Sequence, residues 1–239
     1  MTPDQKLLNG SQLLLECSLN NNTIEYDNNV YEVNSSMISF KFANQYYNED
    51  KIRMISPTAA QLVVNEATID DNGMYFCMLN ISGLDHHPLV CVSHVLVGFK
   101  PQPVSNFKCI SLHYRRLHCS WTPPPNPIPT SYHLEDSVHT ASSSNYLVRG
   151  CGIATENSCE WTPDTTPPYR NTVLKFNLIL TGQNQFGVNS EVFVVDHYSI
   201  IKPNIPKNVR PLEVSTDQII LVWKPPDYIE YDEDLLEVI

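Results

Sequence analysis

Glycine and basic side chains are scarce in this chain of 239 residues. Its 8 glycines, against 18 prolines, disfavour glycine-rich phosphate-binding loops and collagen-like repeats. Lysine and arginine number 15 against 26 acidic residues, and the net charge of -11 is a poor match for nucleic acid. No run approaches the roughly 18 apolar residues of a membrane-spanning helix, and the first residues lack the basic and apolar regions of a signal peptide. We therefore expect no nucleic-acid partner, and membrane attachment only through a segment that this sequence does not contain.

Catalytic motifs are missing as well. The sequence has no Gly-x-Ser-x-Gly, no His-Glu-x-x-His and no P-loop, so we expect neither an enzyme nor a cofactor. Zinc could be considered at Cys109, His113, His118 and Cys119, whose side chains all offer metal-binding atoms. On a strand, however, the neighbours His118 and Cys119 would point to opposite faces. We therefore expect no metal at this place.

Apolar and polar residues alternate in several short stretches, and this is the period of a half-buried strand. Helical periodicity is hard to find. The alternating sets are Ile38, Phe40 and Phe42; Leu117, Cys119 and Trp121; and Leu174, Phe176, Leu178 and Leu180. The sequence therefore predicts an all-β fold.

An internal repeat suggests how the chain is divided. A segment that runs from Pro103 to Trp121 resembles one that runs from Pro206 to Trp223, and the two tryptophans are 102 residues apart (223 − 121). A period of about 100 residues is typical of tandem β-sandwiches. Only 16 residues (239 − 223) follow Trp223, so we expect the last sandwich to be truncated. The predicted domains are residues 1–98, 99–203 and 204–239.

The first of these domains carries the motif of an immunoglobulin-like sandwich. Tyr75 stands two residues before Cys77, as in a tyrosine corner, and Cys17 lies 60 residues earlier on an apolar stretch. We predict a disulfide between Cys17 and Cys77. The tryptophan that usually packs against this bridge is missing, and Phe40 is its expected substitute.

The second domain contains four cysteines. Cys109 and Cys119 are close in sequence, as are Cys151 and Cys159, so order along the chain favours two local bridges. Four cysteines allow three connectivities, and the other two remain open at this point. Cys91 is left over: it is either a buried free thiol on a strand with Leu89, Val95 and Val97 on the same face, an intermolecular bridge, or an alternative partner for Cys17 or Cys77.

Four Asn-x-Ser/Thr sequons occur at Asn9, Asn21, Asn34 and Asn80. All of them precede residue 98, and they accompany a cysteine pattern that requires an oxidising environment. We therefore predict glycosylation at these four asparagines and an extracellular location.

The second domain resembles the amino-terminal half of the binding module of class I cytokine receptors, on the evidence of its four cysteines, Cys119-Ser-Trp121, residues 183–187 at the expected turn, and the proline-rich hinge at 202–206. The resemblance implies two fibronectin type III-like domains. An immunoglobulin-like domain ahead of them is the arrangement of the interleukin-six group and its invertebrate relatives within that family.

The resemblance also implies a partner. In these receptors, the elbow between the two fibronectin domains binds a helical-bundle cytokine. This points to Tyr169, Arg170 and Val173 on one side of the elbow and to Tyr228 and Tyr231 on the other. The full-length receptor would form homo- or hetero-oligomers and signal through Janus kinases and STAT factors, while the present chain could bind but not signal.

Two other functions remain compatible with the sequence. One is a cell-adhesion protein built from immunoglobulin and fibronectin domains, and the other is a soluble decoy receptor that sequesters its cytokine. A Trp-Ser-x-Trp-Ser box and a kinase-docking tail in a longer transcript would favour the signalling receptor, whereas many further fibronectin repeats would favour adhesion.

Overall fold

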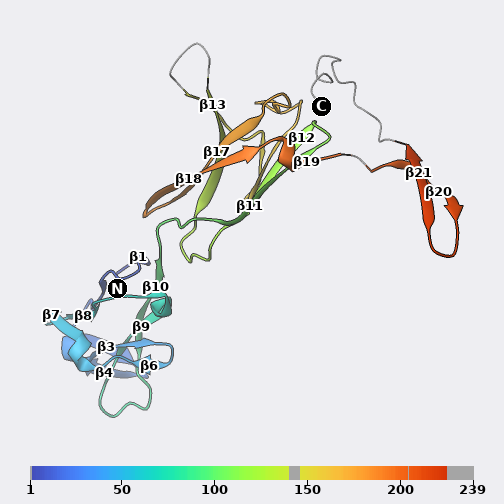
Figure 1. Ribbon diagram of the computed structural model, residues 1–239. Helices are drawn as coiled ribbons and strands as arrows, with labels where there is room; N and C mark the ends of the chain where they lie inside the picture. The colour runs from blue at the N-terminus through green and yellow to red at the C-terminus, as the bar shows by residue number, and fades with distance from the viewer. Residues whose placement is uncertain (1, 140–145, 204, 225–239) are drawn as a thin grey trace. The chain divides into compact units, whose positions relative to one another are not determined.

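The computed structural model describes residues 2–139, 146–203 and 205–224 (Figure 1). This part of the chain is built almost wholly from strands, as the alternating patterns predict. Its helices are four single 3₁₀ turns: η1 (Ser35–Met37), η2 (Glu49–Lys51), η3 (Ile69–Asp71) and η4 (Tyr198–Ile200). Across the described ranges, no helix has the length and apolar character needed to cross a lipid bilayer.

The contacts divide the chain into two compact units. The first unit comprises Met1–Pro101 with the short segments Pro125–Thr130 and Gln183–Val188, and the second comprises the remainder. Each of the two segments carries an asparagine that bonds the backbone of Phe99 in the same unit. Asn126 donates to the carbonyl oxygen of Phe99 at 2.8 Å, and Asn184 donates to the same oxygen at 2.8 Å.

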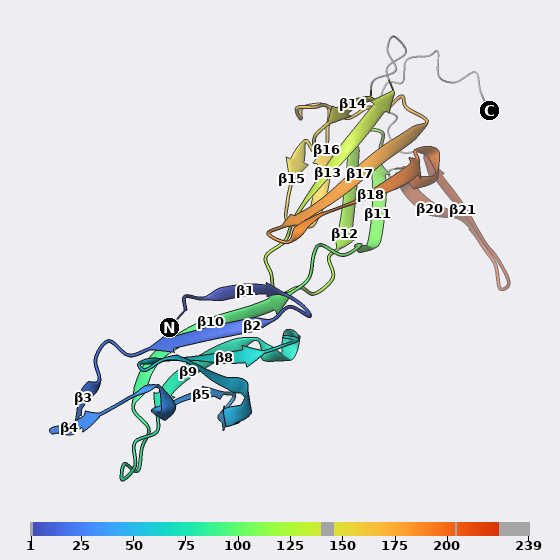
Figure 2. The same ribbon diagram turned by 90° about the vertical axis from the view of Figure 1, so that its left-hand side faces the viewer.

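The first unit is a sandwich of a five-stranded and a three-stranded sheet, accompanied by a small hairpin. The larger sheet has the order β1 (Gln5–Leu8), β10 (Leu89–Gly98), β9 (Gly73–Leu79), β5 (Ile38–Phe42) and β6 (Gln45–Tyr46). The smaller sheet has the order β2 (Leu13–Ser18), β8 (Ala59–Val64) and β7 (Ile52–Ser56), and the hairpin joins β3 (Thr23–Tyr26) to β4 (Asn29–Glu32). Strand β1 runs parallel to β10 (Figure 2).

The core of the first unit confirms the immunoglobulin-like prediction. The disulfide between Cys17 on β2 and Cys77 on β9 joins the two sheets. Tyr75 is fully buried, and its hydroxyl group donates to the carbonyl oxygen of Asp71 at 3.0 Å, which makes the predicted tyrosine corner. Phe40 is fully buried too, and it lies directly opposite Cys77 in the β5–β9 register. It therefore fills the place where a tryptophan was expected.

Strand β10 departs from the expected alternation at its start. The register with β9 shifts between Leu89 and Cys91, and an irregularity of this kind changes the face to which a side chain points. Leu89 is consequently 54% exposed, whereas Val95 and Val97 are fully buried. The expectation that Leu89 shares the buried face of these valines was wrong.

The second unit is also a sandwich of two sheets, with β13, β17 and β18 side by side in Figure 2. The first sheet has the order β15 (Ile153–Ala154), β16 (Ser158–Trp161), β12 (Arg116–Thr122), β11 (Ser105–Leu112) and β19 (Ile201–Lys202). The second has the order β14 (Tyr146–Arg149), β13 (Ser131–His139), β17 (Lys175–Asn184) and β18 (Gly187–Asp196). Their facing side chains include the buried Leu117, Trp121, Trp161, Phe176 and Leu178.

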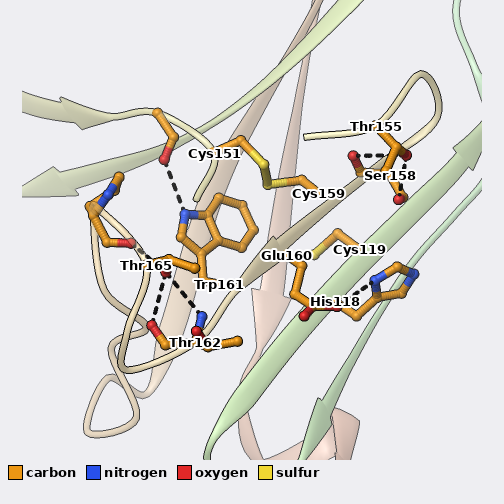
Figure 3. The surroundings of a disulfide bond; sticks show 12 residues. His118, Cys119, Cys151, Thr155, Ser158, Cys159, Glu160, Trp161, Thr162 and Thr165 are labelled. Carbon is orange, nitrogen blue, oxygen red and sulfur yellow. Dashed lines mark hydrogen bonds and ion pairs between the residues drawn. A yellow bond between two sulfur atoms is a disulfide. The ribbon is translucent and has the colours of Figure 1, made fainter. Parts of the chain in front are cut away.

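Both local disulfides of the second unit have the predicted connectivity. Cys109 and Cys119 are direct partners in the antiparallel β11–β12 register and are bonded to each other. Cys151 is bonded to Cys159 next to Trp161 (Figure 3). The Trp161 indole nitrogen donates to the carbonyl oxygen of Gly150 at 3.0 Å, so this bridge and this tryptophan fix the same short loop.

The alternation predicted for residues 174–180 holds from Phe176 onward. Phe176, Leu178 and Leu180 are buried, but Leu174 is 65% exposed and precedes the start of β17. Its expected place in the core was wrong because the pleat does not extend to it.

The last described strands form a two-stranded hairpin, β20 (Lys207–Val214) with β21 (Ile219–Lys224). Trp223 is 61% exposed there, whereas its sequence counterpart Trp121 is 5% exposed on β12. The difference follows from the surroundings, since Trp121 faces a second sheet and the described residues offer Trp223 no such cover.

Candidate functional site

The predicted binding residues Tyr169, Arg170 and Val173 all lie in one segment of the second unit, between β16 and β17. Two other pieces of chain reach the same end of the sandwich. One is the turn after β11, whose His113 donates its backbone N–H to the carbonyl oxygen of Lys202 at 3.2 Å. The other is η4 with the preceding His197, whose N–H donates to the carbonyl oxygen of Leu174 at 2.9 Å. We call this end of the second unit the corner.

Tyr169 is part of the core at the corner and is only 8% exposed. Its hydroxyl group lies 2.7 Å from Ser111 Oγ and 2.5 Å from His197 Nε2. The other ring nitrogen of His197, Nδ1, lies 2.7 Å from the carbonyl oxygen of Val173. Because a carbonyl can only accept, Nδ1 carries the proton; Nε2 then accepts from Tyr169, which in turn accepts from Ser111. This chain of hydrogen bonds ties three separate strands and loops together.

His197 is 1% exposed, and burial lowers its pKa below the usual 6.5. The hydrogen bond to Val173 and the charge of Asp196 act in the opposite direction but are weaker. Protonation would also put a hydrogen on Nε2, which is the atom that accepts from Tyr169. The corner is therefore assembled around a neutral histidine.

This burial predicts that the second unit loses stability in acid. The pKa of His197 is lower in the folded state than in the unfolded state, so the unfolded state binds more protons once the pH drops below about 6.5. The free energy of unfolding should therefore be highest above that pH and fall as the pH decreases through the folded-state pKa. Urea unfolding followed by tryptophan fluorescence at pH 7.5 and pH 5 would measure the difference. A H197Q variant should show a smaller dependence on pH, and an unchanged dependence would contradict the assignment to His197.

Arg170 makes an ion pair inside the protein. Its Nε and Nη2 atoms lie 2.9 and 2.5 Å from Asp136 Oδ2 on β13, and its guanidinium group stands 5.6 Å from the centre of the Phe176 ring. The side chain of Arg170 is 21% exposed and that of Asp136 is 7% exposed. Within the described part of the chain, the other oxygen of Asp136 has no hydrogen-bond partner, so Arg170 is the main compensation for this buried charge.

The exposed side chains of the corner are different ones. Leu174 is 65% exposed and Tyr198 is 53% exposed. Tyr114 lies beside them, since its ring centre is 5.6 Å from that of His197, the residue before Tyr198. Val173 is half-buried and packs against the core. The corner therefore presents apolar side chains to solvent next to its buried hydrogen-bond network.

The three candidates Tyr169, Arg170 and Val173 lie together at the corner, and each of them has a partner within the protein. The predicted binding residues did not include Leu174, Tyr198 or His197. The one signal for Leu174 in the sequence is its position close to Tyr169. Tyr228 and Tyr231 lie outside the described residues.

The sequon asparagines all lie on the surface of the first unit. Asn9, Asn21, Asn34 and Asn80 are exposed. At Asn34, the side-chain oxygen accepts from the backbone N–H of Ser36 at 2.9 Å and from its hydroxyl group at 2.6 Å, which leaves the side-chain nitrogen pointing away from these bonds. All four positions are thus accessible for modification.

Two of the four candidate zinc ligands are cysteines. Cys109 and Cys119 are joined in a disulfide, so neither offers a thiolate to an ion beside His113 and His118. Among the described residues, the one group of three metal-binding side chains that lies together is Cys17, Cys77 and Cys91, of which the first two are bonded to each other.

The chain is similar in sequence to curated cytokine receptors. It is 24% identical over 232 residues to a protein named cytokine receptor from Drosophila melanogaster, covering 95% of this chain and 17% of that protein. It is 25% and 26% identical over 172 residues to the ciliary neurotrophic factor receptor subunit alpha of Mus musculus and Homo sapiens, covering 70% of this chain and 42% of each of those proteins. The chain thus spans between about a sixth and two fifths of the length of these relatives. No family model matches it.

Solved structures with a similar arrangement of strands include domains A168–A170 of titin, with 12% identity, a TM-score of 0.48 and coverage of 83% of this chain and 62% of that one. The full ectodomain of mouse nectin-like molecule 4 has 13% identity, a TM-score of 0.46 and coverage of 93% and 77%. By sequence, the chain resembles the ectodomain of a class I cytokine receptor.

Proposed function

We propose that this chain is the cytokine-binding part of a class I cytokine receptor and that a helical-bundle cytokine docks at the corner of the second unit. The observation that carries the proposal is the similarity to a cytokine receptor over 95% of the chain. The two local disulfides next to Cys119-Ser-Trp121 support it, since they make up the module that the resemblance rests on.

The residues of the corner differ in exposure, and this supports different roles for them in binding. Leu174 and Tyr198 present apolar surface to solvent, and removal of this surface from water by a partner favours binding. Tyrosine is also enriched among the residues that carry most of the binding energy of interfaces. Tyr169 offers a partner only 8% of its surface, so we assign it a positioning role. Arg170 and Val173 are partly exposed and would touch the partner at the edge of the contact. Tyr228 and Tyr231 stay candidates for the opposite side of the elbow.

The wider function belongs to the same proposal. The full-length receptor would lie at the plasma membrane or be secreted, with this part outside the cell and glycosylated at Asn9, Asn21, Asn34 and Asn80. Binding of a cytokine would bring receptor chains together as homo- or hetero-oligomers. Their cytoplasmic tails would then activate Janus kinases and STAT factors. Residues 1–98, 99–203 and 204–239 are the proposed domains.

The proposal predicts that a charge at Leu174 weakens binding without unfolding the protein. The purified chain would be immobilised and probed by surface plasmon resonance with a panel of purified helical-bundle cytokines, with β-rich cytokines as class controls. For a cytokine that binds, L174D should raise Kd at least about tenfold, because the partner would bury an unpaired carboxylate, and this costs more than the roughly 1.4 kcal/mol of a tenfold change.

A matched control is available on β18. Val192 is 65% exposed, as is Leu174, but it lies on a strand outside the corner, so V192D should leave Kd unchanged within about twofold. Equal loss in the two variants would place the contact elsewhere. Absence of binding by every helical-bundle cytokine up to about 10 μM would contradict the proposed function itself.

A further inference from the structure

Three sulfur atoms meet in the core of the first unit. Cys17 and Cys77 form the disulfide between the sheets, and Cys91 is a free thiol on β10. The Sγ atom of Cys91 lies 3.5 Å from that of Cys17, and all three sulfurs lie within 4.8 Å of one another. A free thiol so close to a disulfide is a nucleophile next to its electrophile.

We propose that Cys17, Cys77 and Cys91 form a thiol–disulfide exchange site. Cys91 loses its proton to solvent, and its thiolate attacks Cys17 Sγ. A Cys17–Cys91 bond forms while the Cys17–Cys77 bond breaks, and Cys77 leaves as the thiolate that takes up a proton. One thiol and one disulfide are present before and after the step, so it needs neither an oxidant nor a reductant.

The topology allows either bridge, Cys17–Cys77 or Cys17–Cys91, to connect the two sheets. Cys77 and Cys91 are direct partners in the β9–β10 register, while Cys17 belongs to β2 in the opposite sheet. A bond from Cys17 to either of them therefore joins the two sheets. The bridged residues are separated by 60 positions in one case and 74 in the other. The entropy of loop closure depends on the logarithm of this separation, so the two disulfide isomers differ little in loop-closure entropy.

The half-buried position of Cys91 sets the conditions for exchange. Its side chain packs against the core but keeps some contact with solvent, so it can be deprotonated from outside. The three sulfurs form a compact group, and in-line attack requires the Cys91 side chain to rotate toward the axis of the existing bond. Only the thiolate attacks a disulfide, so the exchange should be faster at pH 8 than at pH 6.

The methionines make the two isomers easy to distinguish. Met78 lies between Cys77 and Cys91, and Met74 precedes them, so cyanogen bromide would release residues 75–78 as a short peptide that carries Cys77 alone. The intact protein would be incubated at pH 6 or pH 8 and unfolded in the presence of N-ethylmaleimide. It would then be cleaved without reduction in acid, where exchange stops. We expect label on Cys77 as well as on Cys91, with faster appearance at pH 8.

Two variants complete the test. C91S should carry no label on Cys77, and C77S should be secreted with a Cys17–Cys91 bridge and no free thiol in the first unit. Cyanogen bromide leaves Cys91 and the four cysteines of the second unit in one fragment, residues 79–239, so this fragment would be digested further with trypsin, which cleaves after Lys108. The peptides that carry the Cys109–Cys119 and Cys151–Cys159 bridges then serve as internal controls, since they should stay unlabelled throughout. Label confined to Cys91 in the wild-type protein after a day at pH 8, or two free thiols in folded C77S, would overturn the proposal. If C77S does not fold, the labelling of the wild-type protein decides alone.

Discussion

Replacing both Cys17 and Cys77 by alanine should lower the free energy of unfolding of the first unit by about 4 kcal/mol. The bridge joins residues that are 60 positions apart, and closure of so long a loop restricts the unfolded chain strongly. The bridges in the second unit span 10 and 8 positions. Their removal should cost about 2.5 kcal/mol each by the same relation. The three double variants should therefore rank in the order of loop length.

The free energy of unfolding must be measured separately for each of the two units. All three tryptophans, at positions 121, 161 and 223, lie in the second unit, so their fluorescence follows that unit and not the first. Amide hydrogen exchange of β9 would report on the first unit. The C91A variant breaks no bridge and is the control, with an expected loss below about 1 kcal/mol. A loss for C17A/C77A no larger than that of the two short bridges would contradict the entropic account.

The second large effect is expected for R170A, which should destabilise the second unit by about 3 kcal/mol. Removal of the guanidinium group leaves the charge of Asp136 on a side chain that is only 7% exposed, and an unpaired buried charge is costly. Adding D136N to R170A should restore at least half of the lost stability, since an amide group needs no counter-charge. Urea unfolding followed by tryptophan fluorescence measures both variants.

The chain offers a matched control for this ion pair. Arg116 Nη2 lies 2.5 Å from Glu160 Oε2, but its side chain is 50% exposed. R116A should therefore cost less than about 1 kcal/mol, because solvent screens the exposed pair. Equal losses for R116A and R170A, or no recovery on adding D136N, would show that the buried charge of Asp136 does not determine stability at the corner.

Much of the fold follows from short-range features of the sequence. Alternation along β5 and β12 predicts buried faces. The face of β12 is buried throughout, and that of β5 is buried at Ile38 and Phe40 and half-buried at Phe42. The Tyr75–Cys77 spacing predicts the tyrosine corner because the contact forms within one turn of chain. The three disulfide pairings were also correct, since two of them join cysteines that are near neighbours in sequence and the third accompanies the tyrosine.

The remaining features depend on contacts that the sequence does not reveal. The register irregularity before Cys91 turns Leu89 outward, and no residue type in the sequence indicates this irregularity. His197 is buried because one distant segment, residues 169–173, supplies partners for both of its ring nitrogens. The burial of Tyr169 has the same origin, as its hydroxyl group finds Ser111 on another strand. Cys91 was recognised as an alternative partner of Cys17, but its distance of 3.5 Å could come only from the three-dimensional packing.

The parallel pairing of β1 with β10 has a mechanical consequence. Gln5 pairs with Val95 and Leu8 with Gly98, so the start of β1 and the end of β10 lie at opposite ends of the paired segment. Tension applied through these two ends loads the hydrogen bonds of the pair in shear, and all of them must fail together. An antiparallel hairpin such as β20–β21, pulled from its two open ends, would unzip one bond at a time. The first unit should therefore withstand far higher pulling forces than that hairpin.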